Sequence, residues 1–579
     1  MERLPDFSED SLNKLNTEGQ FICLVEQQPI ALPFDRIKTM VLALQELLLS
    51  EDKGKSMRIS SLHARQLLAD GNLNKARWLG ADKMRKFVEQ INLLGKAREV
   101  ETPKDFACVL RDYQKDGVAW LQIVSQGGLG GILADDMGLG KTVEVLAHIL
   151  IDKQAGRLKH PVLVVCPTSV LPNWSAEIKR FCPTLRAISF AGLGRMALMD
   201  QLKQADIVLT TYGSLLRDIE TLAAHDWHGI ILDEAHAIKN PQAKVAECVK
   251  KISANYRFCL TGTPVENHLG ELWSEFDFIL PGMLGDKTRF AKLIRKPIEK
   301  GGDEQLRKAL ASRIRPFILR RTKAEVLKEL PDKTVIIKRV ELSNKQLALY
   351  ETIRLSCQDR LQAEIAKKGF NRVQIEILDA LLKLRQVCCH PRLVNLPSAK
   401  GIEESAKLET LLEMIEQLSL EGRKILLFSQ FTSMLDLVAE QLQSRSIKFV
   451  QLRGDTRDRV TPVEEFKTGA DIPVFLLSLK AGGVGLNLTA ADTVIHYDPW
   501  WNPAAEDQAT DRAYRIGQDK NVFVYKLIAN GTLEDRMLLL QERKRALAAS
   551  IYDERGNLGT TFTEDDLRAL MQPIDALTV

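Results

Sequence analysis

The chain lacks the features that mark membrane, secreted and disulfide-stabilised proteins. No apolar run reaches the roughly 18 residues that a membrane-spanning helix needs. The opening MERLPDFSED does not have the basic-then-apolar pattern of a secretory leader, and no CxxC pair occurs among the nine cysteines. We therefore expect a cytoplasmic protein with reduced thiols, no structural zinc and no membrane partner.

Low-complexity tracts and repeats of solenoid length are also missing, which excludes linker-rich and array architectures. The 579 residues are enough for roughly three or four domains of about 100–200 residues each. The 80 Lys and Arg against 76 Asp and Glu give a net charge of +4. This near balance neither establishes nor opposes a polyanionic partner.

Two series of short, β-branched apolar runs organise the chain, and longer helical stretches separate the runs. Strands that alternate with helices predict parallel sheets, so we expect an α/β fold with two lobes. Residues 265–423, between the two series, are expected to be largely helical and charged, without strands. Residues 1–100 are expected to form a mostly helical packing or docking region. The runs are 130–136, 162–167, 187–190, 206–212, 229–235 and 256–262, then 424–430, 449–454, 474–479, 493–498 and 522–529.

The sequence DDMGLGKT (135–142) follows an apolar run and opens a helical stretch. Such a turn points backbone N–H groups and the positive end of a helix at phosphate. A GKT triplet alone is a weak signal, and the GxxxxGK[ST] template wants glycine where this chain has Asp135. In this context we expect Lys141 to reach the β- and γ-phosphates and Thr142 to ligate magnesium. The expected nucleotide-binding residues of the loop are Asp135, Met137, Gly138, Leu139, Gly140, Lys141 and Thr142.

The sequence ILDEAH (231–236) ends another apolar run. Alone it would be a solvated acidic turn, but after a phosphate-binding loop it predicts two distinct carboxylate roles. Asp233 suits a second magnesium contact, and Glu234 is placed to accept a proton from the attacking water. We therefore expect ATP and Mg²⁺ to be used here.

The order of these motifs resembles superfamily-two helicase motors and, more narrowly, the Swi/Snf-type DNA-translocase ATPases, including their bacterial members. The resemblance covers about residues 105–545. Its blocks are LRDYQ (110–114), DDMGLGKT, CPTSVLPNW (166–174), LTTYGSL (209–215), LDEAH, LTGTPVEN (260–267), RPFILRRTKAEVLKELPDK (315–333), LRQVCCHP (384–391), ILLFSQFTSMLD (425–436) and the long stretch 478–518.

The resemblance implies two RecA-like parallel-sheet lobes with helical insertions. Its domains would be a helical helicase-associated region over 1–100, an ATP-binding lobe over 101–322 and a helicase C-terminal type lobe over 323–579. The insertions would be a helical protrusion at about 266–312 in the first lobe and another at about 340–420 in the second, which would end in C-terminal helices.

Further site residues are carried over from the resemblance. Gln114 matches the glutamine that reads adenine, and Arg512 and Arg515 match the arginine fingers. A guanidinium stays charged and offers a planar fork to phosphate oxygens, so it completes a site when the second lobe delivers it. The matching phosphodiester-tracking motifs offer hydroxyls, amides and glycines that approach a nucleic-acid backbone without reading bases. Taken singly, each candidate residue is better explained as an ordinary loop residue at a strand end. The candidates are Thr168, Thr211, Gln430, Gly483 and Gly485.

The resulting hypothesis is an ATP-driven motor that translocates on double-stranded DNA and remodels or displaces bound protein without obligatory strand separation. A strand-separating DNA or RNA helicase shares every ATPase residue and remains the alternative. A catalytically silent scaffold would be marked by loss of Lys141, Glu234 or Arg515, and all three are present. No chromatin-reading domain is visible, so a nucleosome substrate is not supported. In a bacterium such a motor would associate with the nucleoid, and the sequence does not indicate its oligomeric state.

Overall fold

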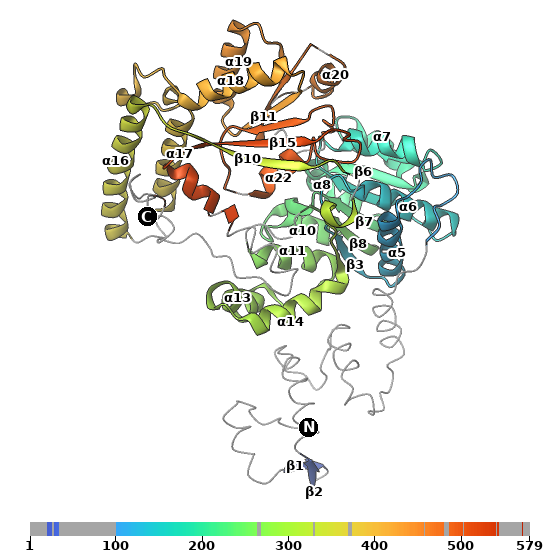
Figure 1. Ribbon diagram of the computed structural model, residues 1–579. Coiled ribbons are helices and arrows are strands. Elements are labelled where there is room, and N and C mark those ends of the chain that lie inside the picture. Colours follow the sequence, from blue (N-terminus) through green and yellow to red (C-terminus); the bar gives the residue numbers. More distant parts are fainter. Residues whose placement is uncertain are drawn as a thin grey trace. The chain divides into compact units, whose positions relative to one another are not determined.

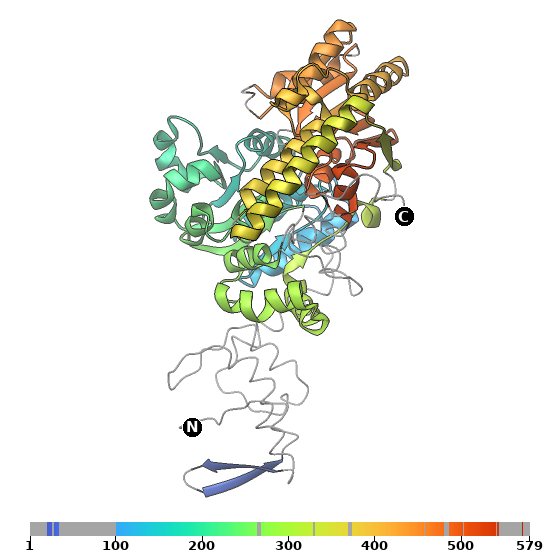
Figure 2. The same cartoon turned by 90° about the vertical axis from the view of Figure 1, so that its left-hand side faces the viewer.

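A computed structural model describes residues 20–25, 28–33, 100–262, 268–327, 330–368, 373–454, 456, 458–469, 471–479, 486–501, 503–539, 541–542 and 570. The chain divides into two compact units, Met1–Ala97 with Leu280–Asp286, and Arg98–Ile279 with Lys287–Val579. In the first unit, β1 (Gln20–Val25) pairs with β2 (Gln28–Pro33) as an antiparallel hairpin (Figure 2). The sequence did not predict this hairpin, and most of the region 1–100 that was expected to be helical lies outside the described residues.

A seven-stranded sheet in the second unit defines the first lobe (Figure 1), with the order β5-β6-β4-β7-β8-β3-β9 and every pair parallel. Its central strands are continuous apolar runs because both faces are covered. The six predicted runs each coincide with one of β3–β8. The strands are β3 (Gly130–Leu133), β4 (Val162–Cys166), β5 (Ala187–Ser189), β6 (Ile207–Thr211), β7 (Trp227–Asp233), β8 (Ala254–Leu260) and β9 (Ile318–Leu319).

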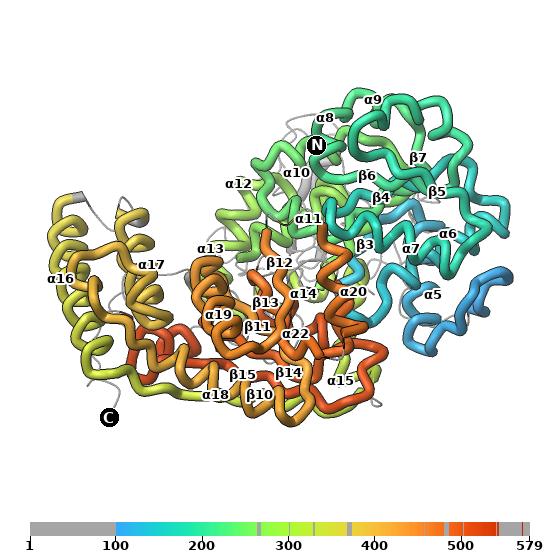
Figure 3. The backbone as a smooth tube through the Cα atoms, turned by 90° about the horizontal axis from the view of Figure 1, so that it is seen from above, coloured from blue at the N-terminus to red at the C-terminus, as the bar shows by residue number. Residues whose placement is uncertain are grey.

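Helices lie on both faces of this sheet. Figure 3 shows the strands between one group formed by α5, α6 and α7 and another that contains α8, α10 and α11. The carboxyl ends of parallel strands meet at one edge of a sheet, where ligands bind in such folds. The helices are α5 (Asp112–Gln126), α6 (Lys141–Gln154), α7 (Leu171–Phe181), α8 (Tyr212–Arg217), α9 (Ile219–Ala223), α10 (Lys244–Lys250) and α11 (Leu269–Ile279).

A six-stranded parallel sheet defines the second lobe, with the order β10-β15-β14-β11-β13-β12. Alternate residues of β11 face opposite sides. Ile425 and Leu427 join a core cluster with α18 and α19, whereas Leu426 and Phe428 join one with α20 and α22. The elements are β10 (Lys333–Val340), β11 (Ile425–Ser429), β12 (Phe449–Leu452), β13 (Val474–Ser478), β14 (Thr493–His496), β15 (Val522–Ala529), α18 (Ala406–Leu420), α19 (Thr432–Ser444), α20 (Val460–Thr468) and α22 (Pro503–Thr510).

Helical insertions occur in both lobes, as the sequence predicted. The second insertion contains α16 and α17, which pack side by side (Figure 3). The prediction that 265–423 holds no strand was wrong, because β9 and β10 lie there. β9 has two residues, and β10 is a largely exposed edge strand whose longest apolar run is three residues, so neither leaves the longer apolar run of a buried strand. The inserted helices are α12 (Lys287–Arg289), η4 (Phe290–Arg295), α13 (Lys296–Gly301), α14 (Glu304–Ile314), α16 (Asn344–Lys368) and α17 (Gln374–Cys389).

Within the described part of the chain, no helix is both long and apolar enough to cross a membrane. The described cysteines are free thiols. The same residues contain no cluster of three or more His, Cys, Asp or Glu side chains that could hold a metal ion. The domain boundaries remain predictions, and most of the expected C-terminal helices fall outside the described residues.

Candidate active site

The phosphate-binding loop (P-loop, residues 135–142) follows β3 and ends at the first turn of α6. Gly138 and Gly140 have φ values of 88° and 93°, which favour glycine. A Cβ added at Gly138 would lie 2.7 Å from Cβ of Arg515, and one added at Gly140 would lie 2.5 Å from Nε2 of Gln114. The amine of Lys141 donates to the carbonyls of residues 135 and 136. The loop is therefore a tight turn of backbone amides, of the kind that cradles phosphate.

Asp135 departs from the P-loop template because its side chain holds another segment. Its carboxylate is fully buried and accepts hydrogen bonds from the backbone and guanidinium of Arg321, including 2.9 Å from Arg321 N and 3.1 Å from Nε. Arg321 also donates to both carboxylate oxygens of Glu144, at 2.7 and 2.8 Å. Burial, with the second carboxylate nearby, raises the pKa of Glu144 to about 8, although Arg321 opposes the rise. The nucleotide-binding role of Asp135 stays a prediction, and its carboxylate is used by Arg321.

Asp233 is the last residue of β7, and three neighbours fix its position. The indole Nε1 of Trp174 donates to its Oδ2 at 2.8 Å, and the backbone N of Glu234 donates to Oδ1 at 2.9 Å. The hydroxyl of Tyr212 donates to its carbonyl at 2.8 Å. Burial and the adjacent Glu234 raise the pKa of Asp233 to about 6. Such an oriented carboxylate suits a cation, whose charge would favour its ionised form.

Glu234 is held in the left-handed region, with φ 49° and ψ 58°. This conformation is strained for a residue other than glycine, and such strain gathers at functional sites. Its Oε2 lies 3.5 Å from Nδ1 of His236. Burial would raise the pKa of Glu234, but His236, Arg512 and Lys141 together hold it below its usual value. Glu234 is thus kept as a carboxylate, the form that can accept a proton.

The turn after α22 brings Arg512 and Arg515 to the P-loop. Nη2 of Arg512 lies 3.6 Å from Sδ of Met137, and Arg515 packs against Gly138. Burial lowers the pKa of both guanidiniums, yet with a reference pKa above about 12 they stay charged. Burial raises the pKa of Glu177 on α7, and the nearby Arg515 and Thr142 oppose the rise. The structure therefore joins the predicted arginines, the P-loop and the two acidic residues in one constellation.

Gln114 reaches the P-loop through protein contacts. Its Oε1 accepts from the backbone N of Arg111 at 3.0 Å, and its Nε2 donates to the carbonyl of Leu139 at 3.0 Å. The hydroxyl of Tyr113 donates to the same carbonyl at 2.8 Å. These contacts place Gln114 beside the loop, and its reading of adenine remains a prediction.

The candidate nucleic-acid contacts are spread over both lobes. Thr168 is exposed just beyond β4, whereas the buried Thr211 caps α8 by accepting from the backbone N of Ser214 at 3.1 Å. The backbone N of Gln430 donates to Oδ1 of Asp498 at 3.3 Å, and its side-chain nitrogen is buried without a hydrogen-bond partner. The other two candidates, Gly483 and Gly485, lie outside the described residues.

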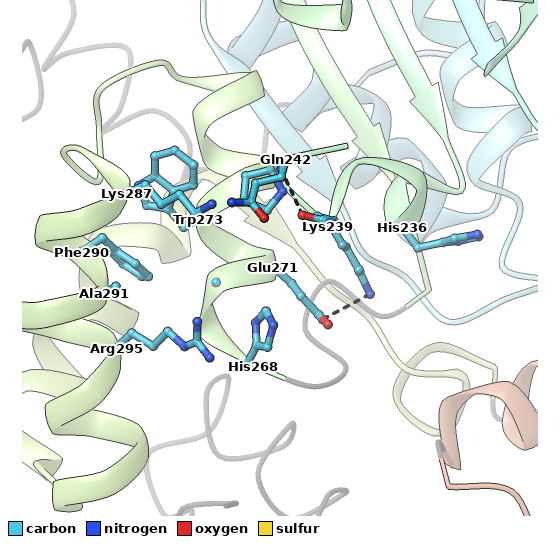
Figure 4. Close-up of a pocket in the computed structure, with 13 residues that line it drawn as sticks. His236, Lys239, Gln242, His268, Glu271, Trp273, Lys287, Phe290, Ala291 and Arg295 are labelled. Atoms are coloured by element: carbon cyan, nitrogen blue, oxygen red, sulfur yellow. Dashed lines mark hydrogen bonds and ion pairs between the residues drawn. The ribbon is translucent and has the colours of Figure 1, made fainter. Parts of the chain in front are cut away.

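A pocket of about 590 Å³ is lined in part by His236, which lies two residues after Glu234 in the sequence (Figure 4). Its lining includes Lys239, whose Nζ lies 3.8 Å from Oε2 of Glu271, and Arg295 of the π-helical segment η4. None of the residues predicted from the sequence lines it. The hydrolysis site is therefore defined by the contacts around the P-loop and not by this pocket.

Four residues of the constellation were missed or undervalued by sequence reasoning. Trp174 entered the sequence analysis only as the last residue of the CPTSVLPNW block; it is buried, and its indole donates to Asp233. Tyr212, Arg321 and Glu177 had no predicted role. Tyr212 lies in the block LTTYGSL, Arg321 lies in RPFILRRTK, and Glu177 closely follows CPTSVLPNW. Their positions within or beside these blocks could have indicated a role, whereas their residue types alone could not.

Two protein-family domains match the chain. The SNF2-related domain matches residues 113–393, and the helicase conserved C-terminal domain matches residues 406–517. The first match spans the described elements from α5 to η7 (Pro391–Leu393), the turn that follows α17, and the second spans α18 to the arginine-bearing turn.

Individual relatives agree with these matches. The chain is 36% identical, over 97% of its length, to YwqA of Bacillus subtilis, whose name describes an ATP-dependent helicase/translocase, and it spans 62% of that protein. It is 33% identical, over 85% of its length, to the TATA-binding protein-associated factor MOT1 of Saccharomyces cerevisiae, of which it spans 30%. The solved SWI2/SNF2 ATPase core of Sulfolobus solfataricus in complex with dsDNA is 36% identical, with 82% of this chain and 99% of that chain covered and a TM-score of 0.41.

Proposed function

The chain belongs to the SNF2-related family, a family of ATP-dependent helicase-like enzymes, and we propose that it is an ATP-hydrolysing motor that translocates on double-stranded DNA. In this proposal it remodels or displaces DNA-bound protein without obligatory strand separation. The observation that carries the proposal is the meeting of Arg512 and Arg515, which follow a helix of the second lobe, with the P-loop of the first.

We expect the P-loop to bind a nucleoside triphosphate together with magnesium. Gly138 and Gly140 have positive φ values, and a Cβ at either position would clash with Arg515 or Gln114, so glycine keeps the loop tightly turned with its amides available to phosphate. Lys141 would bind the β- and γ-phosphates, and the hydroxyl of Thr142 with the carboxylate of Asp233 would hold Mg²⁺. When bound, the ion would offset phosphate charge and orient the phosphoryl group. Trp174 and the backbone of Glu234 keep the Asp233 oxygens directed by hydrogen bonds.

Glu234 and the arginine pair would supply the remaining chemistry. The lowered pKa of Glu234 keeps its carboxylate ionised, so it can orient the attacking water and take its proton. Arg512 lies close enough to Glu234 to stabilise that charge. The pair would stabilise the charge that develops on the phosphoryl oxygens, a contribution of about 10³–10⁵ in rate in other NTPases. Because the arginines come from the second lobe, hydrolysis would depend on contact between the lobes.

The chain spans less than two thirds of the curated relatives named above, so the substrate is part of the proposal. The name of YwqA describes a translocase, which supports movement along nucleic acid. The name of MOT1 describes a factor associated with TATA-binding protein, which supports a DNA-bound protein as the substrate. Thr168 and Gln430 follow the carboxyl ends of β4 and β11, where backbone contacts with phosphates are favoured.

The proposal is tested by ATPase rates measured side by side with no nucleic acid, single-stranded DNA, duplex DNA and RNA. We expect duplex DNA to stimulate hydrolysis most, and we expect Glu234→Gln to abolish turnover while nucleotide binding persists. Displacement of a third strand from a triplex would report translocation, and a tailed duplex would report strand separation. Hydrolysis indifferent to duplex DNA, or a normal rate in Glu234→Gln, would contradict the motor. Release of a strand from the tailed duplex would favour the helicase alternative.

A further inference from the structure

Lys323 is a buried lysine in the segment that joins the two sheets. It follows β9 (Ile318–Leu319), begins α15 (Lys323–Val326) and precedes β10 (Lys333–Val340). Only 6% of Lys323 is exposed. A buried ammonium is tolerated when it is paired and hydrogen-bonded, so its partners indicate its role.

Lys323 contacts both the P-loop and the arginine-bearing turn. Its backbone N donates to Oδ2 of Asp136 at 3.0 Å. Its Nζ donates to Oδ1 of Asp511 at 2.6 Å and to the carbonyl of Tyr514, and it lies 5.1 Å from the centroid of the Tyr514 ring. One residue therefore attaches to the first lobe through its main chain and to the second lobe through its side chain.

The side-chain partners are the immediate neighbours of the two arginines. Asp511 precedes Arg512, and Tyr514 precedes Arg515. A Cβ placed on Gly138 would lie 3.8 Å from Cε of Lys323 and 2.7 Å from Cβ of Arg515. The lysine stem and the arginine thus lie against the same glycine. A movement of Asp511 away from Lys323 would carry both guanidiniums away from the P-loop.

We propose that Lys323 and Asp511 form a positioning pair that holds the turn with Arg512 and Arg515 against the P-loop. The inference rests on the proposed ATPase function. Lys323 is not a catalytic residue in this scheme, because its ammonium is used by Asp511 and Tyr514. Displacing a catalytic group by about 1 Å can cost about 100-fold in rate, so losing the pair should lower turnover much more than nucleotide binding.

The test compares Asp511→Asn, Lys323→Met and the double variant with the wild-type chain. Steady-state ATPase with duplex DNA gives kcat and KM, and a fluorescent ADP titration gives the affinity of the P-loop. We expect each single variant to lose about 10- to 100-fold in kcat, with the ADP dissociation constant within about twofold of wild type. The double variant should lose no more than the worse single variant, because the pair acts as one unit.

Lys333→Met is the matched control. The ammonium of Lys333 lies 5.4 Å from the centroid of the same Tyr514 ring, but Lys333 is exposed and forms no ion pair among the described residues. This variant should keep at least about half of the wild-type kcat.

Three outcomes would overturn the pairing. The first is a folded, ADP-binding Asp511→Asn or double variant with kcat near wild type. The second is multiplicative losses in the double variant. The third is failure of both the Asp511→Asn and the double variant to fold, which would show that the pair is required for folding and not for positioning the arginines. Absence of ATPase in the wild-type chain would instead refute the proposed function, so the two failures are distinguishable.

Discussion

Arg321→Met should destabilise the first lobe more than any exposed substitution. The Arg321 side chain is 11% exposed, and the Asp135 and Glu144 side chains that share it are 0% exposed. Removing the guanidinium leaves the Asp135 carboxylate buried without its cation and the Glu144 carboxyl without its hydrogen-bond donor. Breaking a buried ion pair in this way costs about 3–5 kcal/mol.

The structure also predicts where the damage appears. The backbone N atoms of Ala134 and Asp136 donate to the carbonyls of Leu319 and Arg321, at 2.7 and 3.0 Å. The P-loop is thereby attached to the segment that Arg321 anchors. We expect Arg321→Met to weaken ADP binding as well as stability.

The assay is urea unfolding followed by tryptophan fluorescence, which reports on the buried Trp174 and Trp227 of the first lobe. Arg315→Met is the control, because Arg315 is exposed and should change the free energy of unfolding by less than about 0.5 kcal/mol. Adding Asp135→Asn and Glu144→Gln to Arg321→Met should restore part of the loss, since it removes the uncompensated charges. Equal stability of the Arg321→Met and Arg315→Met variants would refute the reasoning.

Three further predictions follow from the same site. The pKa of Glu144 is raised from 4.5 to about 8 by burial, so its stabilising contribution is complete below about pH 4.5 and is lost as the pH rises through about 8. Glu144→Gln should flatten the dependence of the free energy of unfolding on pH over this range. An unchanged pH slope would contradict this prediction. Gly138→Ala should reduce kcat by at least about tenfold, because its new Cβ would lie 2.7 Å from the side chain of Arg515. The control is Gly156→Ala, with φ 68° and no atom within 4 Å, which should cost only about 1–2 kcal/mol in backbone strain. Equal kcat values in both variants would argue against a steric effect at the P-loop. Trp174→Phe removes the 2.8 Å hydrogen bond to Asp233. This loss should raise the Mg²⁺ concentration for half-maximal ATPase activity by about tenfold, which corresponds to about 1.4 kcal/mol for a hydrogen bond to a charged group. An unaltered Mg²⁺ titration would show that this bond does not orient the carboxylate.

Central and edge strands differ in how much signal they leave in the local sequence. β4 and β7 are buried on both faces, so each left an apolar run that could be read directly. Six of the eight residues of β10 are exposed, one is partly buried and one is buried, and its apolar residues are only Val335, Ile336, Ile337 and Val340. It belongs to the sheet through its pairing with β15, which is nearly two hundred residues further along the chain. An edge strand of this kind is set by its partner and has little local signal of its own.

The sequence by itself determined the α/β class, the P-loop at 135–142 and the acidic pair at 233–234, because each is a contiguous pattern with its own local chemistry. Three contacts depend on the tertiary structure alone. Asp135 accepts hydrogen bonds from Arg321, the hydroxyl of Thr211 caps α8, and Lys323 pairs with Asp511. The contacts of Arg321 and Lys323 join residues 186 and 188 positions apart. Strand order and chain crossings bring such distant segments together, and a charge that is then buried must be paired within the fold. The partner of such a charge therefore cannot be predicted from its neighbours in the sequence.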